Sequence, residues 1–187
     1  MTDVHQRAQI VLDTIRQRRS VSIDKLSHRE VPEDVLRLIL EAGCWAPSHG
    51  RREPWHFTVF RGEAHKRLGE ILATSFAASS ARDHDSPEAQ QAQRERPLKA
   101  PVWISLELHI PQPPRFDESE EISALACAAQ NMMLAAQALG LGSKWVSSAA
   151  MLHPLTAQAL RAPRVLGFLY LGFQYPTTSL FPCPEQH

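Results

Sequence analysis

Apolar positions along the chain predict helices separated by short strands. Apolar side chains recur every three or four residues in several stretches, which is the spacing of a helix with one buried face. Helices are predicted at residues 3–18, 32–44, 63–81 and 154–161. Shorter apolar runs predict strands at residues 55–61, 101–110, 144–148 and 164–174. Helices therefore alternate with strands, which favours one layered domain, residues 1–187, of α+β or α/β class with the strand order left open.

A further helix, predicted at residues 117–139, has a different pattern. No charged residue occurs between Glu121 and Lys144, and alanine is the commonest residue there. The stretch is too weakly apolar for a bilayer span and contains several amides. A helix that is apolar nearly all round is covered by protein on every side, and in a small domain this favours contact with a second subunit.

Two segments lack a face that could be buried. Residues 82–99 are polar, and this composition predicts either a mobile segment that leaves the core or a short helix in solvent. The tail, residues 176–187, shows no periodic pattern.

Composition restricts the class of partner. The chain has 20 basic and 20 acidic residues, so its net charge favours neither nucleic acid nor an anionic membrane. The three cysteines are widely spaced, which argues against a disulfide framework and a zinc site and suits a reducing cytoplasm. The N-terminus lacks the apolar core of a signal peptide. The expected partner is a small molecule or another protein.

Several catalytic motifs are missing from the sequence. Gly140 and Gly142 follow a predicted helix and lack the third glycine of a dinucleotide fingerprint. The sequence contains no Walker A, HExxH or GxSxG motif. None of the nine histidines has a second metal ligand at helical spacing, so no metal site is predicted. The sequence also shows no catalytic triad or dyad.

Residues 45–57 gather aromatic rings and positive charge in one loop. The loop contains two tryptophans, two histidines and two arginines between a helix and a strand, and Pro47 and Gly50 prevent helix continuation. Flat rings beside guanidinium groups suit a planar anionic ligand. The alternative is a linker whose aromatic side chains fill the core.

Two other stretches permit both a structural and a binding interpretation. Arg18, Arg19 and Ser20 follow the first helix and could grip a phosphate, or the arginines could complement the helix C-terminus. Lys144 and Trp145 lie in a strand that could present backbone N–H groups to a ligand or belong only to the core.

Taken together, four motifs in this order resemble the FMN-dependent nitroreductase family, and most closely its small single-domain bacterial members. The motifs are Arg-Arg-Ser at 18–20, Ala-Pro-Ser at 46–48 with Pro-Trp-x-Phe at 54–57, Leu-Gly-Leu-Gly-Ser at 139–143 and Gly-Phe-Leu-Tyr-Leu-Gly at 167–172. The resemblance extends over roughly residues 11–174.

The resemblance implies an α+β fold with a central, mainly antiparallel sheet flanked by helices, in an intertwined homodimer with two FMN sites at the subunit interface. It implies that Arg18, Arg19 and Ser20 hold the phosphate and ribityl chain. Lys144 would belong to the same site, and Trp145, Val146 and Ser147 would offer backbone contacts near flavin N5. The opposing subunit would supply Trp45, Ser48, His49 and Arg51, and the helix over residues 122–139 would form the dimer core.

The implied reaction has two half-reactions, in which NADH or NADPH reduces FMN and a nitroaromatic, quinone or similar acceptor then takes the electrons. The alternatives are another flavin reaction on the same fold and a flavin or nucleotide sensor without turnover. The zero net charge disfavours a nucleic-acid-associated protein. Ser22, Arg51 and Glu53 depart from the residues common in the family, and residues beyond 164 contain no lysine or arginine. Arg51 or Arg52 is therefore expected to replace a missing positive charge near the flavin.

Overall fold

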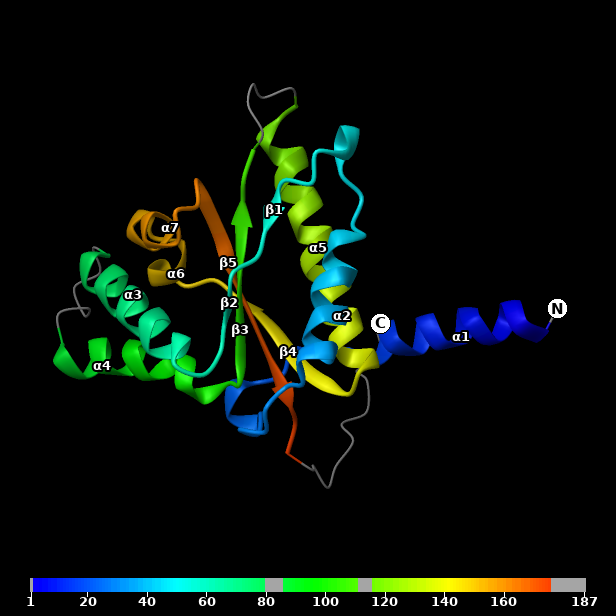
Figure 1. Cartoon of the computed structure of the whole chain (residues 1–187), viewed down its shortest axis with the longest axis horizontal. Helices are drawn as coiled ribbons and strands as arrows, with labels where there is room; N and C mark the ends of the chain where they lie inside the picture. The colour runs from blue at the N-terminus through cyan, green and yellow to red at the C-terminus, as the bar shows by residue number, and fades with distance from the viewer. Residues whose placement is uncertain (1, 80–85, 111–115, 176–187) are drawn as a thin grey trace, which may run out of the picture.

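A five-stranded antiparallel sheet forms the centre of the chain in the computed structural model, which describes residues 2–79, 86–110 and 116–175 (Figure 1). The strands are β1 (Trp55–His56), β2 (Val59–Phe60), β3 (Val102–Leu108), β4 (Leu141–Val146) and β5 (Arg164–Phe173). Their order is β1-β3-β5-β4, and β2 also pairs with β3. All the pairs are antiparallel, which confirms the antiparallel α+β fold.

Helices cover both faces of this sheet (Figure 1). The α-helices are α1 (Thr2–Gln17), α2 (Glu33–Cys44), α3 (Ala64–Ala78), α4 (Pro87–Glu95), α5 (Glu118–Ala138), α6 (Ala149–Leu152) and α7 (Pro154–Leu160). Short 3-10 turns occur at η1 (Ile23–Lys25), η2 (His49–Arg51) and η3 (Arg96–Lys99). Every residue of β3 is buried, because Ile104 and Leu106 pack in the cluster under α2 and α5 while Trp103 packs in the cluster on the α3 side.

The predicted strand at 55–61 forms as two short strands that share one register with β3. Between them, the backbone N–H of Thr58 donates to the Ser105 hydroxyl at 3.1 Å, while Ser105 N–H donates to the Thr58 carbonyl at 2.9 Å. A side-chain acceptor thus replaces a backbone acceptor, which interrupts the regular ladder.

Strand β4 begins and ends earlier than the predicted 144–148. Gly140 adopts a φ of 79°, which lets the chain turn directly from α5 into the sheet at Leu141. At the other end, the Ser148 hydroxyl accepts from Met151 N–H at 3.4 Å and begins the unpredicted helix α6.

Within the polar segment 82–99, residues 87–95 form helix α4. Ser86 caps this helix by accepting from Ala89 N–H at 3.2 Å. The helix lies against α3 so closely that a Cβ on Gly69 would come within 2.3 Å of the Arg94 carbonyl oxygen. Of the two alternatives for this segment, the structure therefore contains the helix, and α4 packs against α3. Residues 82–85 and the tail 176–187 lie outside the described residues.

Helix α1 extends away from the body of the molecule and contacts α5 near its base (Figure 1). Five of its large apolar side chains are 45–61 % exposed: Val4, Ile10, Val11, Leu12 and Ile15. Helix α5 is buried on its sheet side, yet Ser123, Cys127 and Gln130 form an exposed strip. The helices of the described chain include none that is long and apolar enough to cross a membrane.

Candidate functional site

The segment after α1 lies against the outer edge of β4. Ser20 forms a parallel bridge with Ser143, and Val21 N–H donates to the Ser143 carbonyl at 3.1 Å. Gly142 makes this approach possible, because a Cβ there would lie 2.9 Å from the Val21 side chain. The Arg-Arg-Ser motif and the strand that follows α5 are therefore neighbours, although they are far apart in sequence.

Tyr170 of β5 fixes the same segment from inside the fold. Its hydroxyl donates to the Val21 carbonyl at 2.9 Å. Burial raises the pKa of Tyr170, against a smaller lowering by the charge of Arg96. The hydroxyl consequently stays protonated at neutral pH and remains a donor to this backbone.

Alternation along β4 decides which of its backbone groups face the open edge. In an antiparallel strand, the N–H and C=O groups of one residue point to the same side, and those of the next residue point to the opposite side. Since the Ser143 carbonyl faces outward to Val21, the same alternation turns the backbone groups of Trp145 outward and those of Lys144 and Val146 toward β5. The outer edge thus presents the N–H of Trp145 about 7 Å from the Ser20 bridge, at roughly 3.3 Å per residue.

The indole of Trp145 is held in place by β5. Its Nε1 donates to the Leu166 carbonyl at 3.1 Å. Gly167 has a φ of 126°, and a Cβ there would lie 2.7 Å from that indole nitrogen and 2.5 Å from the Val146 carbonyl oxygen. The missing side chain at Gly167 therefore sets the position of Trp145.

Arg18 and Arg19 bring positive charge to the Ser20 end of this edge. Arg18 is half-buried and Arg19 is exposed. Arg19 donates to the carbonyl of Arg16 and, at 2.8 Å, to that of Arg18, so its guanidinium complements the C-terminus of α1 in this chain. The helix-end interpretation holds for Arg19, and an anion at Ser20 would compete with carbonyl oxygens for its donors.

The other predicted residues lie in the loop between α2 and β1. Trp45 follows α2 and is 77 % exposed. The Ser48 hydroxyl accepts from the Glu53 N–H at 3.2 Å. His49 pairs with Glu120 and stacks on Phe116, with ring centroids 3.6 Å apart.

The backbone of this loop is unusual after Ser48. Gly50, Arg51 and Glu53 all have positive φ, at 63°, 55° and 48°. Such values are uncommon for residues with a Cβ other than Asn and Asp. Arg51 and Glu53 are the two loop positions at which the resemblance suggests a departure from the family, and the side chain of Arg51 is exposed.

Arg52, the other arginine expected near the flavin, has a structural role. Its Nε lies 3.2 Å from Glu121 Oε1, and the two side chains are only 12 % and 1 % exposed. This buried ion pair anchors the loop to the first turn of α5. Of the two arginines expected to face the flavin, only Arg51 keeps its charge at the surface.

The predicted site residues therefore form two groups at opposite ends of α5. His49 contacts Glu120 in the first turn of α5, whereas Ser20 pairs with Ser143, just beyond its last turn. A helix of 21 residues spans about 30 Å at 1.5 Å per residue. One mononucleotide cannot contact both groups within one chain.

Sequence patterns missed the residues that hold the two groups in place. The Arg52–Glu121 pair and the contact of Gly167 with Trp145 join positions far apart in sequence. The local spacing of residues could therefore not predict them. The only local signal was the pair of glycines inside an apolar strand, a pattern typical of close backbone approach.

Comparison with known proteins identifies the family of this chain. The profile of the nitroreductase family matches residues 15–173. The chain is 31 % identical over 164 residues to the putative NAD(P)H nitroreductase YdjA of Escherichia coli, with 86 % of each chain covered. The chain therefore belongs to the nitroreductase family.

Solved structures of the family share the fold. The nitroreductase-like protein of Bacillus cereus superposes with a TM-score of 0.75 at 26 % identity, covering 92 % of this chain and 91 % of that one. The Bacteroides fragilis nitroreductase, solved with bound FMN, gives a TM-score of 0.72 at 28 % identity, with 94 % of each chain covered.

Proposed function

We propose that the protein is a homodimeric oxidoreductase that uses FMN to pass electrons from NADH or NADPH to a nitroaromatic, quinone or similar acceptor. Family membership supports the class of reaction, and the name of the Escherichia coli relative and the FMN bound to the Bacteroides fragilis protein support the donor and the cofactor. The observation that carries the proposal is the edge of β4, where Ser20, two residues after Arg18, pairs with Ser143, two residues before Trp145.

The donor set at this edge fits a flavin mononucleotide. Arg18 and the Ser20 hydroxyl would bind the phosphate through charge-assisted hydrogen bonds, and Arg19 would join them by exchanging its carbonyl partners for phosphate oxygens. The backbone N–H groups of Trp145 and Ser147 would donate to the ring edge. Bound FMN would supply the redox chemistry by taking hydride at N5 and passing electrons to the acceptor. The protein would orient donor and acceptor against the ring and would need no nucleophile of its own.

A second copy of the chain would complete the site. The loop that contains Trp45, Ser48, His49 and Arg51 and the phosphate residues adjoin opposite ends of α5, which is about 30 Å long at 1.5 Å per residue, so only another subunit could bring them to the same flavin. The exposed apolar side chains of α1 support this assembly, because an isolated helix of this length is marginal in water and each such side chain contributes about 1.5–3 kcal/mol when buried.

FMN binding and turnover test the proposal directly. The purified protein should bind one FMN per chain, be bleached by NADH or NADPH without oxygen, and recover its colour on addition of a quinone. Arg18→Ala should weaken FMN binding about tenfold or more, since a hydrogen bond to a charged group contributes about 1.5–3 kcal/mol. Arg16→Ala is the matched control, because Arg16 is exposed at the same end of α1 and pairs with Asp13. Protein that takes up no FMN would refute the proposal.

Complementation between subunits tests the shared site. One chain carries Arg18→Ala with Arg19→Ala, and the other carries Ser48→Ala with His49→Ala. Each homodimer should lose FMN binding and turnover, whereas the mixed dimer should regain one intact site. A mixed dimer as inactive as both homodimers would contradict the shared site while leaving the reaction class open.

A further inference from the structure

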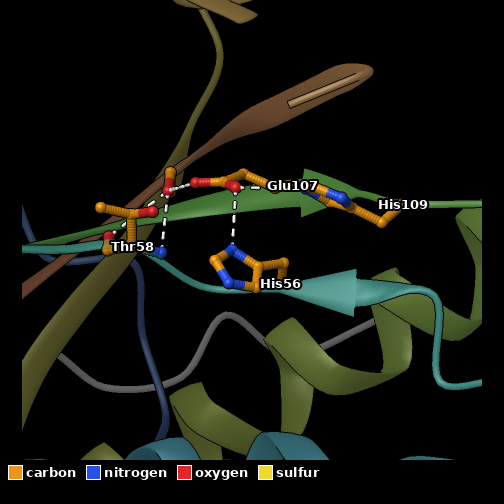
Figure 2. Close-up of polar contacts among 5 residues, drawn as sticks. His56, Thr58, Glu107 and His109 are labelled. Atoms are coloured by element: carbon orange, nitrogen blue, oxygen red, sulfur yellow. Dashed lines mark hydrogen bonds and ion pairs between the residues drawn. The ribbon is translucent and has the colours of Figure 1, made fainter. Parts of the chain in front are cut away.

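Three potential metal ligands lie together on one face at the β1 end of the sheet (Figure 2). His56 of β1 is the direct cross-strand partner of Glu107 in β3. His109 follows Glu107 by two residues, so its side chain returns to the same face. The backbone N–H of His109 donates to the Pro54 carbonyl at 2.7 Å, which continues the ladder past the end of β3.

The ligand atoms of these side chains converge on one point. His56 Nδ1 lies 3.0 Å and His109 Nε2 lies 3.4 Å from Glu107 Oε2, and one ligand atom from each residue lies within 4.8 Å of the other two. Two atoms bound to a tetrahedral zinc ion at about 2.0–2.1 Å lie about 3.3 Å apart. The two separations at Glu107, which hydrogen bonds span in this structure, lie within about 0.3 Å of that value, so an ion could replace the hydrogen bonds with little movement of the side chains.

Burial of the carboxylate gives this cluster a reason to bind a cation. Glu107 is 1 % exposed, and within the described chain no lysine or arginine forms an ion pair with it. A buried carboxylate with only imidazole and hydroxyl partners is costly unless positive charge accompanies it. A divalent ion held between the two rings would supply that charge.

A second layer of contacts fixes the orientation of the carboxylate. The Ser105 hydroxyl donates to Glu107 Oε1 and also accepts from Thr58 N–H at 3.1 Å. The pairing of β3 with β5 shifts register between Ser105 and Glu107, and an irregularity of this kind re-aims side chains. Outer partners that lock a ligand in this way are typical of metal sites.

We propose that His56, Glu107 and His109 bind a divalent transition metal ion of the zinc type. Two imidazoles and one carboxylate are a ligand set that zinc accepts with a fourth position left for water. The side chain of His56 is 62 % exposed and that of His109 is 39 % exposed, so an ion reaches the site from solvent. Strands β3 and β5 separate it from the β4 edge, so the metal site is distinct from the proposed flavin site and does not depend on it.

Metal titration of the full-length, untagged protein tests this site. Replacing Cys44, Cys127 and Cys183 by serine removes thiols that compete for the ion. Calorimetry with Zn²⁺, and absorption spectroscopy with Co²⁺ as a reporter of coordination, should both give one ion per chain. Zn²⁺ should also raise the melting temperature, because an ion that binds only the folded state stabilises it.

Substitutions of the two exposed ligands, His56 and His109, test metal binding without disturbing the folded core. His56→Gln and His109→Gln should each abolish the one-ion stoichiometry, whereas Ser105→Ala should weaken binding by about 10–100-fold, as loss of an outer partner does. His28→Gln is the control, because His28 is exposed and lies on another part of the chain. The proposal fails if either ligand variant binds Zn²⁺ as tightly as His28→Gln, or if the parent protein binds no ion.

Discussion

Glu121→Gln should destabilise the protein far more than Glu118→Gln, although both residues lie in the first turn of α5. Glu121 is 1 % exposed and lies 3.2 Å from Arg52 Nε, whose side chain is 12 % exposed. Glu118 pairs with Arg164 at 2.6 Å, yet both side chains are about half exposed. Glutamine keeps the volume of the side chain and removes its charge, so each variant isolates the charge of one pair.

The expected magnitudes differ because solvent screens only the outer pair. Removing one partner of a buried ion pair costs about 3–5 kcal/mol, and an exposed pair is worth about 0–1 kcal/mol. For a domain of 150–250 residues each kcal/mol shifts the melting temperature by about 2–4 °C, so Glu121→Gln should lower it by about 6–20 °C and Glu118→Gln by less than about 4 °C. Both residues lie near the positive end of the helix dipole, so that contribution is common to the two variants.

Calorimetry or circular dichroism at one protein and FMN concentration measures both shifts. The double variant Glu121→Gln with Arg52→Gln should recover part of the loss, because no unpaired charge then remains buried. Equal shifts for Glu121→Gln and Glu118→Gln would refute the assignment of Arg52 as the buried anchor of the loop.

Two further predictions concern the β4 edge and the helix α3. Gly167→Ala should displace Trp145 and weaken FMN binding, which changed tryptophan emission and a raised Kd would report. Gly140→Ala is the control, because its φ of 79° is also positive but its Cβ would enter open space, so that it should change only stability. Equal Kd values for the two variants would contradict the role of Gly167. Burial lowers the pKa of His65 below 6.5, against a smaller raising by its hydrogen bond to the Phe60 backbone, so the unfolded chain binds this proton first as pH falls. The stability advantage of the parent over His65→Gln should therefore shrink as pH drops through 6.5, and a constant difference across that range would disprove it.

The longer elements with an apolar pattern were the most predictable part of the fold, because that pattern is local to each of them. The expected spans at 117–139 and 164–174 match α5 and β5 to within a residue or so. The strand at 55–61 was predicted as continuous, since nothing near Thr58 indicates that the Ser105 hydroxyl replaces a backbone acceptor. The short helix α6 was missed, because four residues are too few to show a period.

The sequence alone determined the residue types available for chemistry and, through motif order, the family. Tertiary structure decided how they are grouped: Ser20 lies beside Ser143, the loop containing His49 is at the far end of α5, and Arg52 is paired inside the protein. The same holds for His56, Glu107 and His109, whose spacing has no helical period and becomes a cluster only through the register of β1 with β3. Local patterns record which side of an element is buried, whereas register and close approach depend on partners elsewhere in the chain.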